Sequence, residues 1–255
     1  MKIEIIPLRA FRDNYIWCLR NGANAAVVDP GDASPVLEYL ESERVNLVAI
    51  LATHHHPDHV GGVAQLASKY SAPVFGPARE TIPAITRHLQ EGDHVRIDAL
   101  ELQFDVLDIP GHTAGHIAFH GAGMLFCGDT LFSVGCGRVF EGTPPQMLAS
   151  LSKLVALPES TRVYCGHEYT LANIRFAHAV EPDNPALVAR ERETRAALAS
   201  GKPSVPSTLK SELATNPFLR TSVPDVVSAA SARQGHPITD PAEVFAALRD
   251  WKNVF

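Results

Sequence analysis

THHHPDH, residues Thr53 to His59, places four histidines and one aspartate within seven positions. It follows NLVAILA, an apolar run typical of a buried strand, and it precedes VAQLASKY, whose apolar residues have helical spacing. We therefore expect the stretch at the carboxyl end of a strand, the edge where ligands collect in open α/β sheets. So many titratable groups in one turn are either solvated at a surface or held together by a metal ion.

The spacing within the stretch predicts two directions for its side chains. His54 and His56 are two residues apart, so an extended backbone points both side chains the same way. Pro57 forces a turn, which directs Asp58 and His59 elsewhere. The stretch therefore offers two pairs of ligands with different directions.

Three other predicted strands end in the same manner, each with a glycine and then a side chain that binds metals. FDVLDIPGHTAGH leads to His112, MLFCGDT leads to Asp129 and RVYCGHEYT leads to His167. Seven ligands are too many for one tetrahedral zinc, but they suit two ions about 3.5–4 Å apart that share a carboxylate. The candidate metal ligands are His54, His56, Asp58, His59, His112, Asp129 and His167.

Each of these residues also has a simpler interpretation. A lone histidine at a strand end is more often structural, and HHHPDH alone also fits a solvated surface. The conjunction of four strand ends favours the metal site. We expect His55 beside the ligands or in solvent, His116 as a support for the site, and Asp29 as the partner of a ligand histidine.

The bulk composition limits the function. A net charge of −6 argues against a protein that coats nucleic acid or an anionic membrane, because both need a broad basic surface. The amino end lacks the apolar run of about 7–15 residues that a secretory signal needs, and no later stretch spans a bilayer. We therefore expect a cytoplasmic protein with a small-molecule substrate and no nucleic acid or membrane partner.

The four cysteines form no C-x-x-C pair and lie in apolar segments, so they are expected to be buried and reduced. A redox or ligand role for Cys127 or Cys165, which border the histidine motifs, is the alternative.

The pattern of predicted elements changes along the chain. Short apolar runs alternate with helical stretches over the first two thirds, which predicts an α/β fold. After Tyr169 the sequence is mainly helical in spacing. We expect a metal-binding catalytic domain over residues 1–168 and an α-helical substrate-binding domain over residues 169–255.

The order and spacing of THHHPDH, GHTAGH, GDT and CGHEYT resemble the metallo-β-lactamase superfamily. RDNYIW, GCGRVFEGT, GHEYT, NPFLR and RDWKN further resemble the glyoxalase II, or hydroxyacylglutathione hydrolase, family over nearly the whole chain. The first signature is specific for the fold, but lactonases, nucleases and sulfatases share it. The later segments favour the glutathione thioester hydrolase.

The resemblance implies an αββα sandwich followed by a small helical C-terminal domain. It also implies two divalent metal ions, for which we expect zinc, with iron or manganese as alternatives. One ion is held by His54, His56 and His112, the other by Asp58, His59 and His167, and Asp129 bridges them. The implied reaction is hydrolysis of S-D-lactoylglutathione to D-lactate and glutathione, the second step of methylglyoxal detoxification.

Two aspartates carry the expected catalytic roles. Asp129 is expected to bind both ions. Asp58 is expected to accept the proton of the attacking water, and a purely structural ligand role for Asp58 is an equal alternative. The leaving thiolate has a parent pKa of about 8.5 and needs little help from a general acid.

By the same resemblance, the substrate is bound by Arg138, Phe140, Tyr169, Arg249 and Lys252. Arg249 and Lys252 share a helical face, for which a solvated helix end is the alternative interpretation. The family commonly has lysine at position 138 and tyrosine at position 140, so the arginine changes the hydrogen-bond geometry and Phe140 removes a hydroxyl.

Three more residues of these motifs, Asn14, Tyr15 and Arg220, are expected to be mainly structural. The alternatives to the glutathione hydrolase are another hydrolase on the same fold, either a lactonase or a different thioesterase, and a non-catalytic metal-dependent binding protein. We expect a monomer.

Overall fold

The computed structural model describes residues 3–255, and the chain folds into two compact units. The first unit extends from the amino end to Asp108 and also holds Thr113–Gly128 and Tyr164–Glu168. The second unit holds Ile109–His112, Asp129–Val163 and Tyr169–Phe255. The chain therefore enters the second unit three times. The expected domain boundary after residue 168 stays a prediction.

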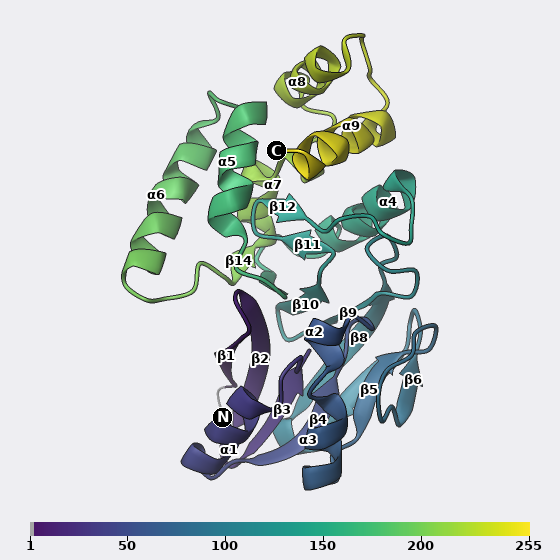
Figure 1. The fold of residues 1–255 in the computed structure, drawn as a ribbon, viewed down its shortest axis with the longest axis vertical. Helices are drawn as coiled ribbons and strands as arrows, with labels where there is room; N and C mark the ends of the chain where they lie inside the picture. The colour runs from purple at the N-terminus through teal and green to yellow at the C-terminus, as the bar shows by residue number, and fades with distance from the viewer. Residues whose placement is uncertain (1–2) are drawn as a thin grey trace. The chain divides into compact units, whose positions relative to one another are not determined.

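The first unit is built on a sheet whose strands follow chain order. They are β1 (Glu4–Ala10), β2 (Asn14–Asn21), β3 (Asn24–Val28), β4 (Asn46–Leu51), β5 (Val74–Pro77) and β6 (Arg87–Leu89). From β3 onward the strands are parallel, as crossover helices require. Helices α1 (Ser34–Glu43) and α3 (Val63–Tyr70) lie in the crossovers from β3 to β4 and from β4 to β5, and they bury apolar residues in a common core with the sheet (Figure 1).

A second sheet in this unit has the order β13 (Arg162–Cys165), β10 (Met124–Gly128), β9 (Ile117–Gly121), β8 (Leu102–Asp108) and β7 (His94–Ile97). The 3₁₀ turn η1 (Asp98–Leu100) joins β7 to β8. Trp17 of β2 packs edge-on against Tyr164 of β13, with ring centroids 5.0 Å apart, and its indole N–H donates to the Cys165 carbonyl. Aromatic packing thus joins the two sheets.

The second unit is mainly helical. Its helices are α4 (Pro144–Val155), α5 (Thr170–Val180), α6 (Pro185–Ala199), α7 (Leu209–Thr215), the 3₁₀ turn η2 (Pro217–Leu219), α8 (Pro224–Gln234) and α9 (Pro241–Asn253). It also holds the hairpin β11 (Leu131–Phe132) and β12 (Gly135–Cys136), and β14 (Ser207–Thr208) pairs with the first half of β13. Helices α5 and α6 lie side by side (Figure 1).

Most of the predicted elements are confirmed. The strands predicted in NLVAILA, FDVLDIPGHTAGH, MLFCGDT and RVYCGHEYT correspond to β4, β8, β10 and β13, and the helix predicted in VAQLASKY is α3. The last three strands end at Asp108, Gly128 and Cys165. The polar residues that follow them therefore stand at strand ends.

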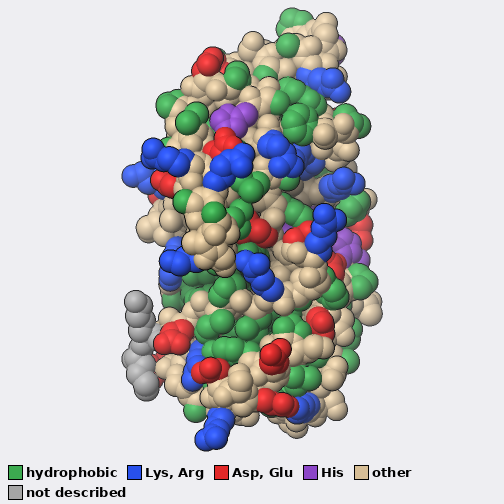
Figure 2. Space-filling model, turned by 60° about the vertical axis from the view of Figure 1, so that its left-hand side comes forward, with side chains coloured by type: hydrophobic (Ala, Val, Ile, Leu, Met, Phe, Trp, Pro, Cys, Tyr) green, Lys and Arg blue, Asp and Glu red, His purple; other side chains and the backbone are tan. Residues whose placement is uncertain are grey.

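Lysine and arginine side chains are interspersed with aspartate and glutamate side chains on the face drawn in Figure 2. None of the helices among residues 3–255 combines the length and the apolar character needed to cross a membrane.

Candidate active site

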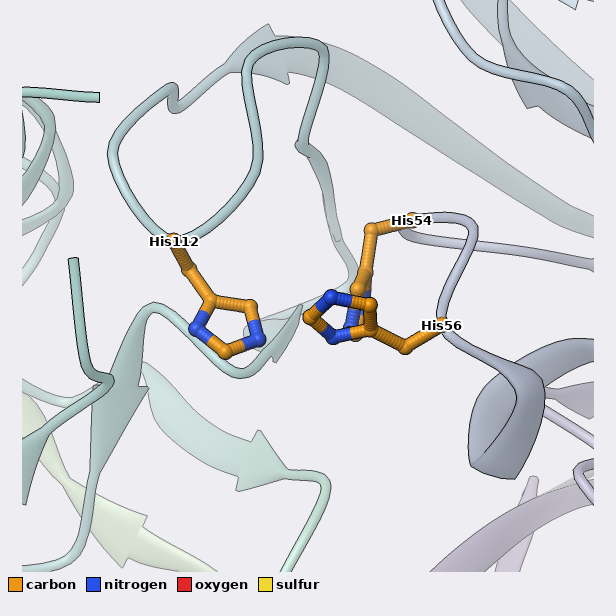
Figure 3. A group of neighbouring side chains, drawn as sticks. All are labelled: His54, His56 and His112. Carbon is orange, nitrogen blue, oxygen red and sulfur yellow. The ribbon is translucent and has the colours of Figure 1, made fainter. Parts of the chain in front are cut away.

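The histidine loop of the first unit connects β4 to α2 (Pro57–Val60), a single helical turn. Pro57 stands at the first helical position, where its missing N–H costs nothing. The turn therefore begins at the proline and turns Asp58 and His59 away from His54 and His56. His54 Nε2 and His56 Nδ1 lie 3.2 Å apart, so these two side chains point the same way, as expected (Figure 3).

Asp58, His59 and His167 converge in the first unit on a volume that a metal ion fits. The Nε2 atoms of His59 and His167 are 3.4 Å apart, and Asp58 Oδ2 lies 3.7 Å from the first and 3.4 Å from the second. Each of the three residues offers one ligand atom within this small volume.

Two carboxylates fix the direction of these imidazoles. His59 Nδ1 donates to Asp29 Oδ2 at 3.1 Å, which is the contact expected of Asp29, and His167 Nδ1 donates to Asp13 Oδ1 at 2.8 Å. Because Nδ1 carries the proton in both rings, Nε2 is left as a lone pair. Two lone pairs and a carboxylate that face one another repel unless a cation lies among them, so this donor set fits a divalent metal.

Asn14, which was expected to be mainly structural, contacts a candidate ligand. Its side-chain amide donates to Asp58 Oδ2 at 2.9 Å and so orients that carboxylate toward His59 and His167. The Tyr15 hydroxyl donates to Glu168 Oε2 at 2.8 Å, and this hydrogen bond joins β2 to the segment that carries His167. Asp13 was missed altogether, although its position beside Asn14 in the RDNYIW motif was a usable signal.

His54 is held in the same tautomer by its neighbours. Thr53 Oγ1 donates to Asp29 Oδ2 at 2.7 Å, so it accepts from His54 Nδ1, 3.0 Å away, and the lone pair falls on His54 Nε2. The ring of His116 stacks on that of His54, with centroids 4.5 Å apart. His116 therefore supports a candidate ligand, as expected.

Glu80 is a second residue that the sequence did not reveal. Its buried carboxylate accepts from the backbone N–H groups of His55 at 2.6 Å and Gly115 at 3.0 Å. It thereby joins the histidine loop to the GHTAGH segment. His55 itself is half-buried, with Nδ1 3.1 Å from Glu80, and so lies beside the ligands.

The second unit contributes His112 and Asp129. His112, the third residue labelled in Figure 3, follows β8, and its Nδ1 donates to the Arg138 carbonyl at 2.8 Å, so its lone pair also falls on Nε2. That nitrogen lies 3.6 Å from Asp129 Oδ2. The unit therefore presents an imidazole and a carboxylate together.

His112 and Asp129 line a pocket of about 400 Å³ within the second unit. The five residues expected to bind substrate line it too: Arg138, Phe140, Tyr169, Arg249 and Lys252. Phe140 is 61% exposed, and its ring centroid is 5.3 Å from that of His112. The role of these five residues in binding stays a prediction.

Arg249 and Lys252 are not a solvated helix end. Arg249 is 5% exposed, and its guanidinium donates to the Cys136 carbonyl at 2.9 Å. Lys252 donates to the Ala172 carbonyl at 3.1 Å. Burial, helped by Arg249, lowers the pKa of Lys252 to about 8. Desolvated cations with unusual pKa values are typical of binding sites.

The four cysteines are buried thiols that form no disulfide within residues 3–255, as expected. Burial raises the pKa of the Cys136 thiol, and it raises that of Cys18 to about 12. These two thiols are therefore neutral and poor nucleophiles.

Comparison with known proteins gives the family. Residues 10–167 match the metallo-beta-lactamase superfamily, and residues 168–255 match the hydroxyacylglutathione hydrolase C-terminus. The hydroxyacylglutathione hydrolase of Nitrosomonas europaea is 54% identical over 99% of this chain and 97% of its own length. The chain belongs to the hydroxyacylglutathione hydrolase family.

One further relative agrees with this assignment, and one solved structure is similar over part of the chain. The hydroxyacylglutathione hydrolase of Alkalilimnicola ehrlichii is 57% identical over 98% of both chains. The solved structure of TTHA1623 in a di-iron-bound form is 32% identical, with a TM-score of 0.53, over 64% of this chain and 91% of its own. The expected fold, a metallo-β-lactamase sandwich followed by a helical C-terminal region, is confirmed.

The first prediction concerns Gly31, which lies against the Asp58 backbone. A Cβ at this position meets the Asp58 carbonyl oxygen at 1.8 Å, so Gly31→Ala displaces Asp58 from His59 and His167. We expect at least tenfold weaker metal binding, since misplaced ligand geometry costs roughly 10- to 100-fold. Competition with a chromogenic chelator measures it.

Gly22→Ala is the matched control, because its Cβ meets nothing within 4 Å although its φ is +60°. It should lower stability slightly and leave metal affinity unchanged. Equal metal affinity in both variants would contradict the placement of Asp58.

Proposed function

We propose that the chain hydrolyses S-D-lactoylglutathione to D-lactate and glutathione with two divalent metal ions. The observation that supports this best is the pocket of the second unit. It is lined both by metal-type ligands, His112 and Asp129, and by desolvated cations suited to a carboxylate, Arg249 and Lys252. Glutathione thioesters need this combination, because a reactive thioester and a remote glycyl carboxylate occur in one molecule.

The metal ligands are assigned by the family resemblance. His54, His56 and His112 are assigned to one ion, Asp58, His59 and His167 to the other, and Asp129 to both. The imidazole tautomers described above support this assignment, since four of the histidines present Nε2 as a lone pair. Zinc is our first choice, and iron is the alternative that the di-iron relative suggests.

The chemistry follows from what the ions and side chains supply. When bound by these residues, divalent ions would supply Lewis-acid chemistry, which lowers the pKa of water and polarises a carbonyl group. Asp58, whose Oδ2 accepts from the Asn14 amide, accepts the proton of the attacking water. The leaving thiolate is stable near neutral pH and needs no general acid.

The pocket residues are assigned to glutathione. Arg249 and Lys252 bind the glycyl carboxylate, while Arg138 and Tyr169 contact the rest of the tripeptide. Phe140 lacks the phenol hydroxyl that is common in the family, so it contributes an apolar contact only. The remaining expectations, a cytoplasmic monomer, stay predictions.

The second prediction tests the reaction itself. Purified protein should hydrolyse lactoylglutathione, lose the activity on treatment with a chelator and regain it with zinc. A spectrophotometric assay of the thioester bond follows all three steps. Full activity in metal-free protein would contradict the metal mechanism, and hydrolysis of a lactone without the thioester would favour the lactonase alternative.

The third prediction concerns the carboxylate contact. Lys252→Ala should raise KM roughly 10- to 100-fold, because a hydrogen bond to a charged group contributes about 1.5–3 kcal/mol. The value of kcat should barely change, since the contact is remote from the thioester and equal in ground and transition states.

Steady-state kinetics test it against Lys202→Ala, an exposed lysine outside the pocket, which should behave as the parent does. A thioester whose glycine is amidated should be insensitive to Lys252→Ala. An unchanged KM for lactoylglutathione would sink the assignment.

The fourth prediction concerns pH. Burial, and then Arg249, Arg175 and Arg138, lower the pKa of Lys252 to about 8, although Cys136 acts in the opposite direction. The ammonium is therefore present below that pH and lost above it, so the affinity for a non-hydrolysable S-alkylglutathione should fall as the pH rises through about 8.

Lys252→Arg keeps the charge at all accessible pH values and should remove this step. Inhibition constants measured from pH 6.5 to 9.5 check both variants. The same pH step in parent and Lys252→Arg would show that another group is responsible.

A further inference from the structure

The segment from Asp129 to Arg138, here called the pocket loop, carries three separate contacts of the pocket. Asp129 is the candidate bridging ligand at its start. The Arg138 carbonyl at its end accepts from His112 Nδ1, and the Cys136 carbonyl accepts from Arg249. A shift of this loop therefore moves Asp129 directly. It also moves the carbonyl groups that hold His112 and Arg249 in place.

The turn of the pocket loop is strained. Between β11 and β12 the chain passes through Val134, which has a φ of 57°. Left-handed backbone is rare for a β-branched residue and costs on the order of 1–3 kcal/mol. Val134 is also fully buried, where it packs with Ile174, Ala177 and Leu187. Such a conformation persists only when its surroundings hold it.

Glu212 on α7 is in direct contact with the strained residue. Its Oε2 accepts the Val134 backbone N–H at 2.7 Å and the Asn216 amide at 3.1 Å. Asn216 donates in turn to the Gly135 carbonyl at 2.9 Å. Glu212 and Asn216 thus hold the backbone of the turn at two adjacent residues, Val134 and Gly135.

Arg190 on α6 completes this network. Its guanidinium donates to Ser133 Oγ at 2.9 Å and lies 3.5 Å from Glu212 Oε1. The Glu212 side chain is 0% exposed, so its charge depends on these partners. A buried ion pair contributes little net stability, but it does fix geometry when its hydrogen bonds are satisfied. Here the geometry that it fixes is that of the pocket loop.

We propose that Glu212, held by Arg190, is a positioning residue for the hydrolysis, acting through the pocket loop on Asp129, His112 and Arg249. The inference rests on the proposed function. Helices α6 and α7 contribute no residue to the pocket lining. Under this proposal they nevertheless affect the reaction, because they hold the pocket loop. A merely structural Glu212 would stabilise the fold without affecting metal affinity or turnover.

The test compares Glu212→Gln with a matched control, Glu181→Gln. Glu181 is also buried and paired with an arginine of the second unit, Arg220, at 2.8 Å, but its contacts lie outside the pocket loop. Both variants replace one oxygen of a buried, Arg-paired carboxylate by an amide. Both should therefore lower the melting temperature.

Only Glu212→Gln is expected to change the site. It should weaken zinc binding in chelator competition and lower kcat, each roughly 10- to 100-fold. Losses of this size are typical when the residues that orient metal ligands or substrate contacts are displaced. KM should rise as well, since the Cys136 carbonyl that holds Arg249 moves with the loop. Parent-like metal affinity and kcat in Glu212→Gln, with a melting temperature lowered as in Glu181→Gln, would overturn the proposal.

Arg190→Lys serves as a milder variant if Glu212→Gln does not fold. Lysine keeps the charge beside Glu212 but loses the planar fork that also reaches Ser133 and Ser211. It should produce a smaller loss of metal affinity and kcat in the same direction, and parent values of both would count against the proposal.

Metal affinity separates this inference from the proposed reaction. If the parent protein fails to hydrolyse lactoylglutathione, the proposed function is wrong, yet the zinc affinities of the parent, Glu212→Gln and Glu181→Gln still decide whether Glu212 positions the loop.

Discussion

Asp29 is the residue on which the geometry of the first unit most depends. Its carboxylate accepts from the Thr53 N–H and hydroxyl, both at 2.7 Å, and from His59 Nδ1 at 3.1 Å. One buried side chain at the end of β3 thus joins the end of β4 to the turn of α2. Thr53 also sets the tautomer of His54. The hydrogen bonds that Asp29 accepts therefore orient His54 and His59, which are assigned to different metal ions.

The sequence reveals the parts of this site that follow a local pattern. A strand, a glycine and a metal-binding side chain lie within a few residues of one another, so His112, Asp129 and His167 can be placed from the chain alone. Glu212 has no such local signal, and Asp13 has only its place beside Asn14 in the RDNYIW motif. Their partners, Val134 and His167, are 78 and 154 residues away, and only the fold brings them together.

The missed elements have a related cause. Strands β11, β12 and β14 have two residues each and cannot show a period of two. Helix α8 buries only Val226 and Ala230, so its apolar stripe is too thin to be recognised. Phe140 could be assigned to the pocket only through the family resemblance, because an exposed aromatic residue in a loop has no pattern of its own.

The interleaved course of the chain bears on how such enzymes are recombined. Val134 comes from the middle of the sequence, yet its buried partners, Ile174, Ala177 and Leu187, come from the helical tail. A chimera made by exchanging the tail after residue 168 would therefore pack Val134 against helices from a different protein. An exchange of the tail must therefore include the β11–β12 hairpin or repack the contact between Val134 and the new helices.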